Sequence, residues 1–488
     1  MTKTKPAPES SSKPAASVPA LLERWFHLSE RGTTVGREVR GGLVTFVTIS
    51  YILILNPLIL GGEASADFAG TALNPLQVAS STALAAGVLT LLFGAIANLP
   101  FAMAAGLGIN SYLAVTMVHQ VTWPEAMGLV LINGVVIVLL AVTGARTAIF
   151  NAIPDALKTA TTVGIGFFIA FIGMVNAGFV TRTQGGPPVQ LGLGGSITSL
   201  PTVLFVITLL LMGILMIRRV PGAILIGIAV GTVFAIVTEA MLGLGPGGPE
   251  NPGGWNLTVP ALPEQIVAMP DFGLVGAFDP FGAFARIGPA AASMLLLTLV
   301  FMNFFDAMGA MTGLARNAEL ADEHGAFPRI RQAFVVEGFG AVLGGATSSS
   351  SNTVFVDSAS GIGEGARTGL ASVISGLLFL AALFFTPLAV IVPMEVGSAA
   401  LVIVGAMMMM QVAKIDWQDL AVGLPAFLCI TTMPLTYSIA NGIGVGFLSW
   451  VIIHAATGRG RKIHWLLWLV SAGFALYFAR AGVEALFA

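Results

Sequence analysis

The sequence predicts an all-α polytopic membrane protein with about fourteen spans, arranged as two inverted repeats of seven. Of its 488 residues, 56% are apolar and only 9% are charged, whereas about a quarter of the residues in a soluble domain are charged. Uncharged intervals long enough for a helix of about 20 residues to cross the hydrocarbon layer recur along the chain. This composition excludes a soluble enzyme, a nucleic-acid binder and a disordered scaffold.

The first 40 residues have the composition of a cytoplasmic tail rather than a signal peptide. They contain seven basic side chains among Pro, Ser and Ala, and no apolar segment comes before Leu43. In a fourteen-span count, most later basic residues fall on the same side of the membrane as this tail. The positive charges therefore predict a cytoplasmic N-terminus, and we expect a multi-pass protein of the cytoplasmic (inner) membrane.

A Gly/Pro-rich stretch near 243–285 divides the chain into halves of similar span number, and each half has one short polar or Gly-rich interruption. The interruptions are 103–112 and 347–358. Irregular backbone at membrane depth is tolerated only where protein or water surrounds it, and paired breaks indicate a transporter binding site. Seven spans per half is an odd number, so the halves must be inverted. The segment 353–356 favours a short strand, and the alternative is two ordinary kinked helices.

Asp306 is the sharpest candidate for a functional residue. It is the only charged residue between Arg286 and Arg316, and a carboxylate at membrane depth costs about 2.5–3.5 kcal/mol on the insertion scale. Asn303 lies one helical turn earlier and shares its face. The alternative is an acid at a helix end, or one that is tied to neighbouring backbone.

Three further polar residues are candidates. Asp357 follows the polar run of the second half, and Asn110 occupies the corresponding place in the first half, where its amide offers both a donor and an acceptor. Helix capping is the alternative for both residues. Glu337 either pairs with a neighbouring helix or relays protons, and the structural role is favoured.

Known motifs for metals and phosphates are absent from the sequence. The five histidines are scattered without a spacing such as H-E-x-x-H, and no phosphate loop is present. The single cysteine, Cys429, excludes a disulfide framework and thiolate metal clusters. We therefore expect no metal site, no cofactor and no ATP-driven motor within the chain.

Five blocks of the sequence, taken together and in order, resemble those of one family. They are Gly42–Pro57, Ala105–Asn110, Phe304–Gly309, Phe355–Ala359 and Pro434–Gly442. The chain resembles, over about 36–485, the AzgA-like hypoxanthine/adenine/guanine permeases. These belong to the nucleobase–cation symporters, together with the xanthine and uracil permeases.

The resemblance implies a particular domain organisation. Spans 1–4 and 8–11 form a core domain, spans 5–7 and 12–14 form a gate domain, and spans 3 and 10 each consist of a short strand and a half-helix. The expected segments are a cytoplasmic tail (1–40), a first core segment (41–146), a first gate segment with an outer loop (147–284), a second core segment (285–392), and a second gate segment with a C-terminal apolar stretch (393–488).

The resemblance also implies proton-coupled uptake of a nucleobase, a purine such as adenine, guanine or hypoxanthine. The implied substrate-binding residues are Asn110, Asn303, Asp306, Phe355 and Asp357, and the implied proton-coupling residues are Asp306, Asp357 and Glu337. The coupling ion is expected to be H⁺ or, alternatively, Na⁺. Two positions depart from the family pattern: Asn303 replaces the first acid of span 8, and Asp357 is shorter than the usual Glu.

The expected partners are a small nucleobase, membrane lipid and a second copy of the chain in a homodimer, and no nucleic acid. Three rival functions remain at this point. A transporter of the same fold would carry xanthine, uracil or an anion, although an anion site favours a cation within spans 3, 8 or 10. Paired intramembrane aspartates can also hydrolyse peptides, but Asp306 and Asp357 lack the flanking patterns of such enzymes. A channel is the third rival.

Overall fold

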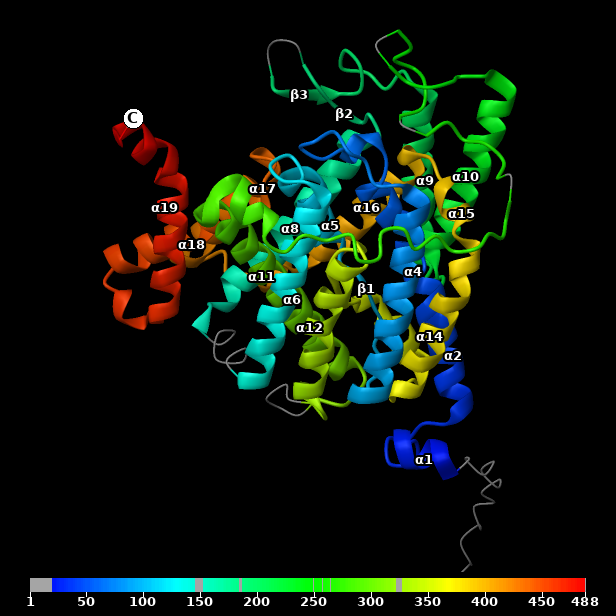
Figure 1. Ribbon diagram of the computed structural model, residues 1–488, viewed down its shortest axis with the longest axis horizontal. Coiled ribbons are helices and arrows are strands. Elements are labelled where there is room, and N and C mark those ends of the chain that lie inside the picture. Colours follow the sequence, from blue (N-terminus) through cyan, green and yellow to red (C-terminus); the bar gives the residue numbers. More distant parts are fainter. Residues whose placement is uncertain are drawn as a thin grey trace, which may run out of the picture.

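The computed structural model describes residues 20–144, 152–183, 187–248, 250–256, 258–263, 265–321 and 327–487. The helices lie side by side in one bundle, with α1 (Ala20–Phe26) at one end and the strands β2 and β3 at the opposite end (Figure 1). Among these described residues, nine helical segments are long and apolar enough to cross a membrane, and four shorter apolar helices accompany them.

Each half of the chain supplies seven consecutive crossings. The first half comprises α2 (Val35–Ile49) with α3 (Ile52–Leu60), α4 (Pro75–Leu92) with η2 (Phe93–Ala97), β1 (Met103–Ala105) with α5 (Leu107–Tyr112) and η3 (Leu113–Met117), α6 (Trp123–Thr143), α8 (Asp155–Asn176), α9 (Leu200–Ile217) and α10 (Ala223–Leu242). The second half comprises α11 (Gly282–Asn317), α12 (Ile330–Ala346), β4 (Asn352–Val354) with η4 (Val356–Ser358) and α13 (Ala359–Gly363), α14 (Gly369–Ala382) with η5 (Leu383–Phe385), α16 (Met394–Met409) with η6 (Met410–Lys414), α17 (Leu420–Leu435) and α18 (Ile439–Ala456). Short α15 (Pro387–Val390) precedes α16, while η7 (Gly460–Lys462) and α19 (Trp465–Phe487) follow α18.

The two interruptions meet in the middle of the bundle. Strands β1 and β4 pair in antiparallel register, as two crossings that enter from opposite sides must do, and Gly106 N donates to Ser351 O at 2.9 Å beside them. All six strand residues are buried. The prediction of short strand-plus-half-helix crossings in spans 3 and 10 is confirmed, and the alternative of two kinked helices is wrong.

Neighbouring helices satisfy the backbone of this crossing. The Thr90 hydroxyl of α4 accepts from Met103 N and donates to Met103 O, both at 3.0 Å. On α12, glycine allows the closest approach, because a Cβ atom at Gly344 would overlap the Ser350 carbonyl. Non-helical backbone therefore persists at this depth only because protein atoms surround and satisfy it.

Helix packing falls into two groups. In one group α6 packs along α12, and α14 packs along both α2 and α4. In the other, α8 packs along α16 and α17, α17 packs along α18, and α9 packs along α10 and α16. Helix α2 begins at Val35, six residues before the expected start of the first core segment at 41.

Irregular chain gathers at the end of the bundle opposite α1 (Figure 1). After α8, the strands β2 (Val180–Arg182) and β3 (Val189–Leu191) form a hairpin that the apolar pattern did not predict. The expected outer loop runs from the end of α10 to the start of α11, and one short turn of it lies against Glu395 at the start of α16.

The last two helices pack against each other. The Phe447 ring of α18 contacts that of Phe474 in α19, with ring centroids 6.4 Å apart. Helix α19 has 23 residues, which corresponds to about 34 Å at 1.5 Å per residue.

At the start of α17, Arg459 Nη1 donates to Asp419 Oδ2 at 2.8 Å. This hydrogen bond lowers the pKa of the Asp419 carboxyl.

Candidate functional site

Asn56 forms the polar centre of the crossing region. This fully buried amide lies in α3, and its Nδ2 donates to Thr82 Oγ1 at 2.7 Å and to Ser349 O at 3.1 Å. Its Oδ1 accepts from Asn110 Nδ2 at 2.5 Å. One side chain thus links span 1 with spans 2, 3 and 10.

Asn110 and Asn303 bring further amide groups to this region. Asn110 lies in half-helix α5, directly after β1, and its Oδ1 has no hydrogen-bond partner among the described residues. Asn303 lies in α11, which contacts α5 and β4, and neither of its amide atoms has a partner in that part of the chain. Both side chains are completely buried. A buried polar atom without a partner costs about 1–3 kcal/mol, so these amides are suited to hydrogen-bonding a ligand.

Asp357 stands at the other end of the crossing with two aromatic rings beside it. Tyr51 Oη donates to Asp357 Oδ2 at 3.4 Å, and the carboxylate is half-buried. The Phe355 ring is 8% exposed, and its centroid lies 6.4 Å from that of Tyr51. A carboxylate next to tilted aromatic rings offers both an acceptor and a flat apolar surface.

Asp306 and Glu337 lie on separate helices, α11 and α12. Asp306 is half-buried, Glu337 is completely buried, and the two carboxyl groups lie near enough to interact electrostatically. The predicted residues Asn110, Asn303, Asp306, Phe355 and Asp357 thus lie on or directly beside elements that contact at the crossing. Glu337 belongs to the helix packed behind β4.

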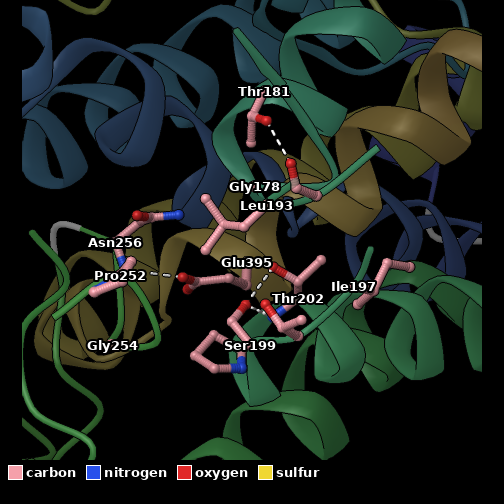
Figure 2. Close-up of a pocket in the computed structure, with 13 residues that line it drawn as sticks. Gly178, Thr181, Leu193, Ile197, Ser199, Thr202, Pro252, Gly254, Asn256 and Glu395 are labelled. Atoms are coloured by element: carbon pink, nitrogen blue, oxygen red, sulfur yellow. Dashed lines mark hydrogen bonds between the residues drawn. The ribbon is translucent and has the colours of Figure 1, made fainter. Parts of the chain in front are cut away.

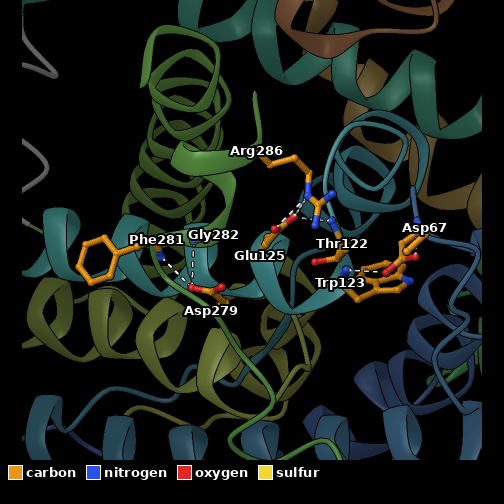
Figure 3. A network of polar contacts seen from close by, with 9 residues as sticks. Asp67, Thr122, Trp123, Glu125, Asp279, Phe281, Gly282 and Arg286 are labelled. Carbon is orange, nitrogen blue, oxygen red and sulfur yellow. Dashed lines mark hydrogen bonds and ion pairs between the residues drawn. The ribbon is translucent and has the colours of Figure 1, made fainter. Parts of the chain in front are cut away.

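The start of α11, the helix that carries Asp306, is fixed by a network of charged groups (Figure 3). Arg286 Nε donates to both Glu125 oxygens, at 2.8 and 2.9 Å. Glu125 also accepts from Thr122 N at the first turn of α6, which forms a capping box. A break at Gly288, with φ of 81°, then separates this first turn from the rest of α11. The ion pair therefore joins the beginnings of spans 4 and 8.

The chemistry available here is hydrogen bonding and proton exchange. Unpartnered buried hydroxyl groups of Ser111, Ser350, Ser351 and Thr353 lie on the same crossing segments as the amides. In the described part of the chain, no group of three His, Cys, Asp or Glu side chains is arranged to hold a metal ion. The donor set fits a neutral polar molecule with donors and acceptors along its edges.

Comparison with known proteins identifies the family of this chain. Residues 36–445 match the sequence family described as the "Permease family". The chain belongs to this permease family. It is therefore a membrane transport protein and not an enzyme.

Several relatives match over nearly the whole chain. The guanine/hypoxanthine permease PbuG of Bacillus subtilis is 34% identical over 460 residues, covering 94% of this chain and 99% of that protein. The adenine permease AdeP of Escherichia coli is 34% identical over 445 residues, covering 91% and 92%. A putative permease of Methanocaldococcus jannaschii is 36% identical, covering 94% and 98%.

Solved structures share the fold at low sequence identity. The transmembrane domain of the cyanobacterial bicarbonate transporter BicA superposes with a TM-score of 0.58 at 14% identity, covering 83% of this chain and 97% of that domain. The structure of SLC26A9 gives a TM-score of 0.57 at 12% identity, with 93% and 73% covered. These likenesses support the inverted-repeat architecture and carry no information about the transported solute.

The sequence did not reveal two residues of this region, Asn56 and Tyr51. Asn56-Pro57 resembles a helix end, yet α3 continues to Leu60 with Pro57 inside it. In the sequence, Tyr51 resembles the other largely apolar side chains of the first span. The sequence does show that Asn56 is the only amide or charged side chain between Arg40 and Glu63, but this does not reveal its partners.

Proposed function

We propose that this protein is a secondary transporter that takes up a purine base together with H⁺ across the cytoplasmic membrane. The names of its relatives support a nucleobase as the solute, because adenine and guanine/hypoxanthine permeases match almost end to end. The observation that carries the proposal is the pair of buried amides, Asn110 and Asn303, with unpartnered atoms beside the crossing strands.

In this proposal the base binds between the crossing and α11. Purine edges carry donors and acceptors side by side, and an amide can match either. Asn110 and Asn303 contact these edges, while Phe355 lies against the face of the ring. Asp357 accepts a hydrogen bond from the base, and the Tyr51 hydroxyl keeps its carboxylate in place.

Coupling to H⁺ uses the carboxyl groups of Asp306 and Asp357, with Glu337 near the first. An ionised carboxylate at membrane depth opposes movement through a water-poor environment, and protonation removes that charge. Once protonated and loaded, the helices around the crossing (41–146 and 285–392) move relative to 147–284 and 393–488. The separate packing of α6 with α12 and of α8 with α16 supports this division.

An anion is a weaker candidate. The matching solved structures include transporters of that kind by name. However, the described residues of β1–α5–η3 and β4–η4–α13 include no Lys or Arg, and a buried anion needs such a partner.

The experiment is initial-rate uptake of radiolabelled adenine, guanine and hypoxanthine in a strain that lacks its own purine permeases. We expect uptake to rise as the external pH falls, and Asp306→Asn and Asp357→Asn to lower the rate at least about tenfold and to flatten the pH profile. Asp416→Asn, at an exposed carboxylate, is the matched control and should behave as wild type.

If both aspartate variants keep full pH-dependent uptake at normal expression, the carboxylate mechanism is wrong. Uptake of none of the three purines by the wild type would contradict the proposed substrate. A thermal-shift panel of purines, pyrimidines and xanthine on the purified protein then identifies the solute, because a ligand that binds the folded state raises the melting temperature.

A further inference from the structure

A polar cavity lies at the end of the bundle opposite α1, away from the crossing (Figures 1 and 2). Its volume is about 120 Å³, enough for a small ion with a few water molecules at about 30 Å³ each. The turn after α8, the β2–β3 hairpin, the start of α9, the start of α16 and the loop at 252–256 form its walls. Glu395 is the only charged side chain among the described residues that line it.

The Glu395 carboxylate is buried here, and no basic side chain is among the described residues that line the cavity. Its exposed fraction is 0%, and Oε1 accepts from Asn256 N at 2.9 Å. The other oxygen, Oε2, has no hydrogen-bond partner among the residues that the structure describes. Figure 2 shows the carboxylate extending toward Asn256, with Ser199 and Thr202 on its other side. Asn256 N and the first turn of α16 compensate part of this charge, and the second oxygen is left to accept a cation or a proton.

The other polar groups at the cavity include neutral hydroxyl groups, whose oxygen atoms can act as ligands and are held in fixed positions by hydrogen bonds. Ser199 Oγ donates to Thr202 Oγ1 at 2.6 Å, and Thr202 Oγ1 donates to Ala177 O at 3.0 Å. The loop is tied to α8 because Asn256 Nδ2 donates to Asn176 O at 3.1 Å. These contacts hold the hydroxyl oxygens and the carboxylate around one space before any ligand enters.

The oxygen atoms that line the cavity determine which class of cation it can bind. Hard oxygen ligands suit alkali and alkaline-earth cations, but sites for divalent ions in proteins commonly use several carboxylates. Here one carboxylate is combined with hydroxyl oxygens, which balances a single positive charge. Thiolate and imidazole ligands, which transition metals prefer, are absent from the described lining.

We propose that Glu395, with Ser199 and Thr202, forms a binding site for a monovalent alkali cation, Na⁺, separate from the crossing. The site is also connected to the crossing by the packing of α16 against α3. Two residues after Glu395, Gly397 lies so close to Leu58 of α3 that a Cβ atom there would overlap it. Leu58 belongs to the same helix as Asn56, so cation binding steadies the contact between α16 and the span that holds the crossing together.

The test does not depend on transport and therefore does not rest on the proposed function. Purified protein is melted in NaCl or choline chloride at equal ionic strength, and bound ²²Na⁺ is measured by flow dialysis. We expect Na⁺ at ten times its Kd to raise Tm by about 2 °C and ²²Na⁺ to bind. Glu395→Gln should lose both responses. Glu250→Gln, at an exposed carboxylate on the same loop, should keep both.

Three results would overturn the proposal: equal Tm in Na⁺ and choline, ²²Na⁺ binding retained by Glu395→Gln, or stabilisation by acid alone with no Na⁺ response at any pH. The last result would mean that the carboxylate holds a proton instead. If Glu395→Gln gives too little folded protein, Glu395→Asp keeps the charge on a shorter side chain. It should then need several-fold more Na⁺ for half-saturation, and unchanged affinity would also contradict the site.

Discussion

The Asn56 side chain offers a quantitative test of the crossing. Asn56→Ala removes three hydrogen bonds, to Thr82, Ser349 and Asn110. Side-chain hydrogen bonds in membrane proteins average about 0.6 kcal/mol, and the general value is nearer 1 kcal/mol, so the three sum to about 2–3 kcal/mol. Thr82 keeps its bond to the Val78 carbonyl, whereas Asn110 Nδ2 and the Ser349 carbonyl lose their partner in Asn56.

The assay uses the single cysteine of the chain. Cys429 is fully buried, so a thiol-reactive fluorescent dye labels the protein only as it unfolds. For a chain of this length we expect Asn56→Ala to lower Tm by about 2–5 °C. Asn133→Ala is the matched control. Asn133 is equally buried, but neither of its amide atoms has a hydrogen-bond partner in the part of the chain that the structure describes, so its truncation should cost less than half as much.

A double-mutant cycle isolates the link between the two amides. Because Asn56 and Asn110 contact directly, the double alanine variant should be less destabilised than the sum of the single variants. An additive cycle, or an Asn56→Ala shift no larger than that of Asn133→Ala, would refute the view that Asn56 holds span 1 to the crossing.

Two other predictions follow from contacts at the crossing and at the helix ends. Gly344→Ala places a methyl group on the Ser350 carbonyl. It should lower the free energy of unfolding by about 1–3 kcal/mol or more and abolish most of the purine uptake. The control Gly213→Ala, with open space around the added methyl group, should leave Tm and uptake unchanged. Asp419 has a lowered pKa, so its stabilisation is present above the unfolded pKa and is lost as pH falls through the folded pKa. The Tm difference between wild type and Asp419→Asn should therefore narrow on acidification below about pH 4, and a difference independent of pH would contradict the ion pair.

The sequence predicted the span layout well because charge is expensive inside lipid. Uncharged intervals mark the crossings almost directly: the stretch between Asp419 and Arg459 has no charged residue and contains the two helices α17 and α18. The meeting of the two interruptions was also predictable, since irregular backbone at that depth must be surrounded by protein.

The partners of individual side chains could not be predicted in the same way. Nothing local distinguishes Asn56 from a helix-ending Asn-Pro pair, and its role depends on segments far along the chain. In the sequence, Glu395 is an isolated acid between two uncharged stretches, and only the folded loop at 252–256 shows that it is buried. The substrate and proton-coupling roles of Asn110, Asn303 and the acidic residues stay predictions.

The antiparallel ladder between β1 and β4 has a consequence for biosynthesis. Its two strands are separated by about half the polypeptide, one near residue 104 and the other near residue 353. A nascent chain that has inserted all seven crossings of its first half still presents β1 without a pairing strand. The centre of the protein can therefore be assembled only after the tenth crossing has left the ribosome, and insertion of the early helices must tolerate an unfinished interior until then.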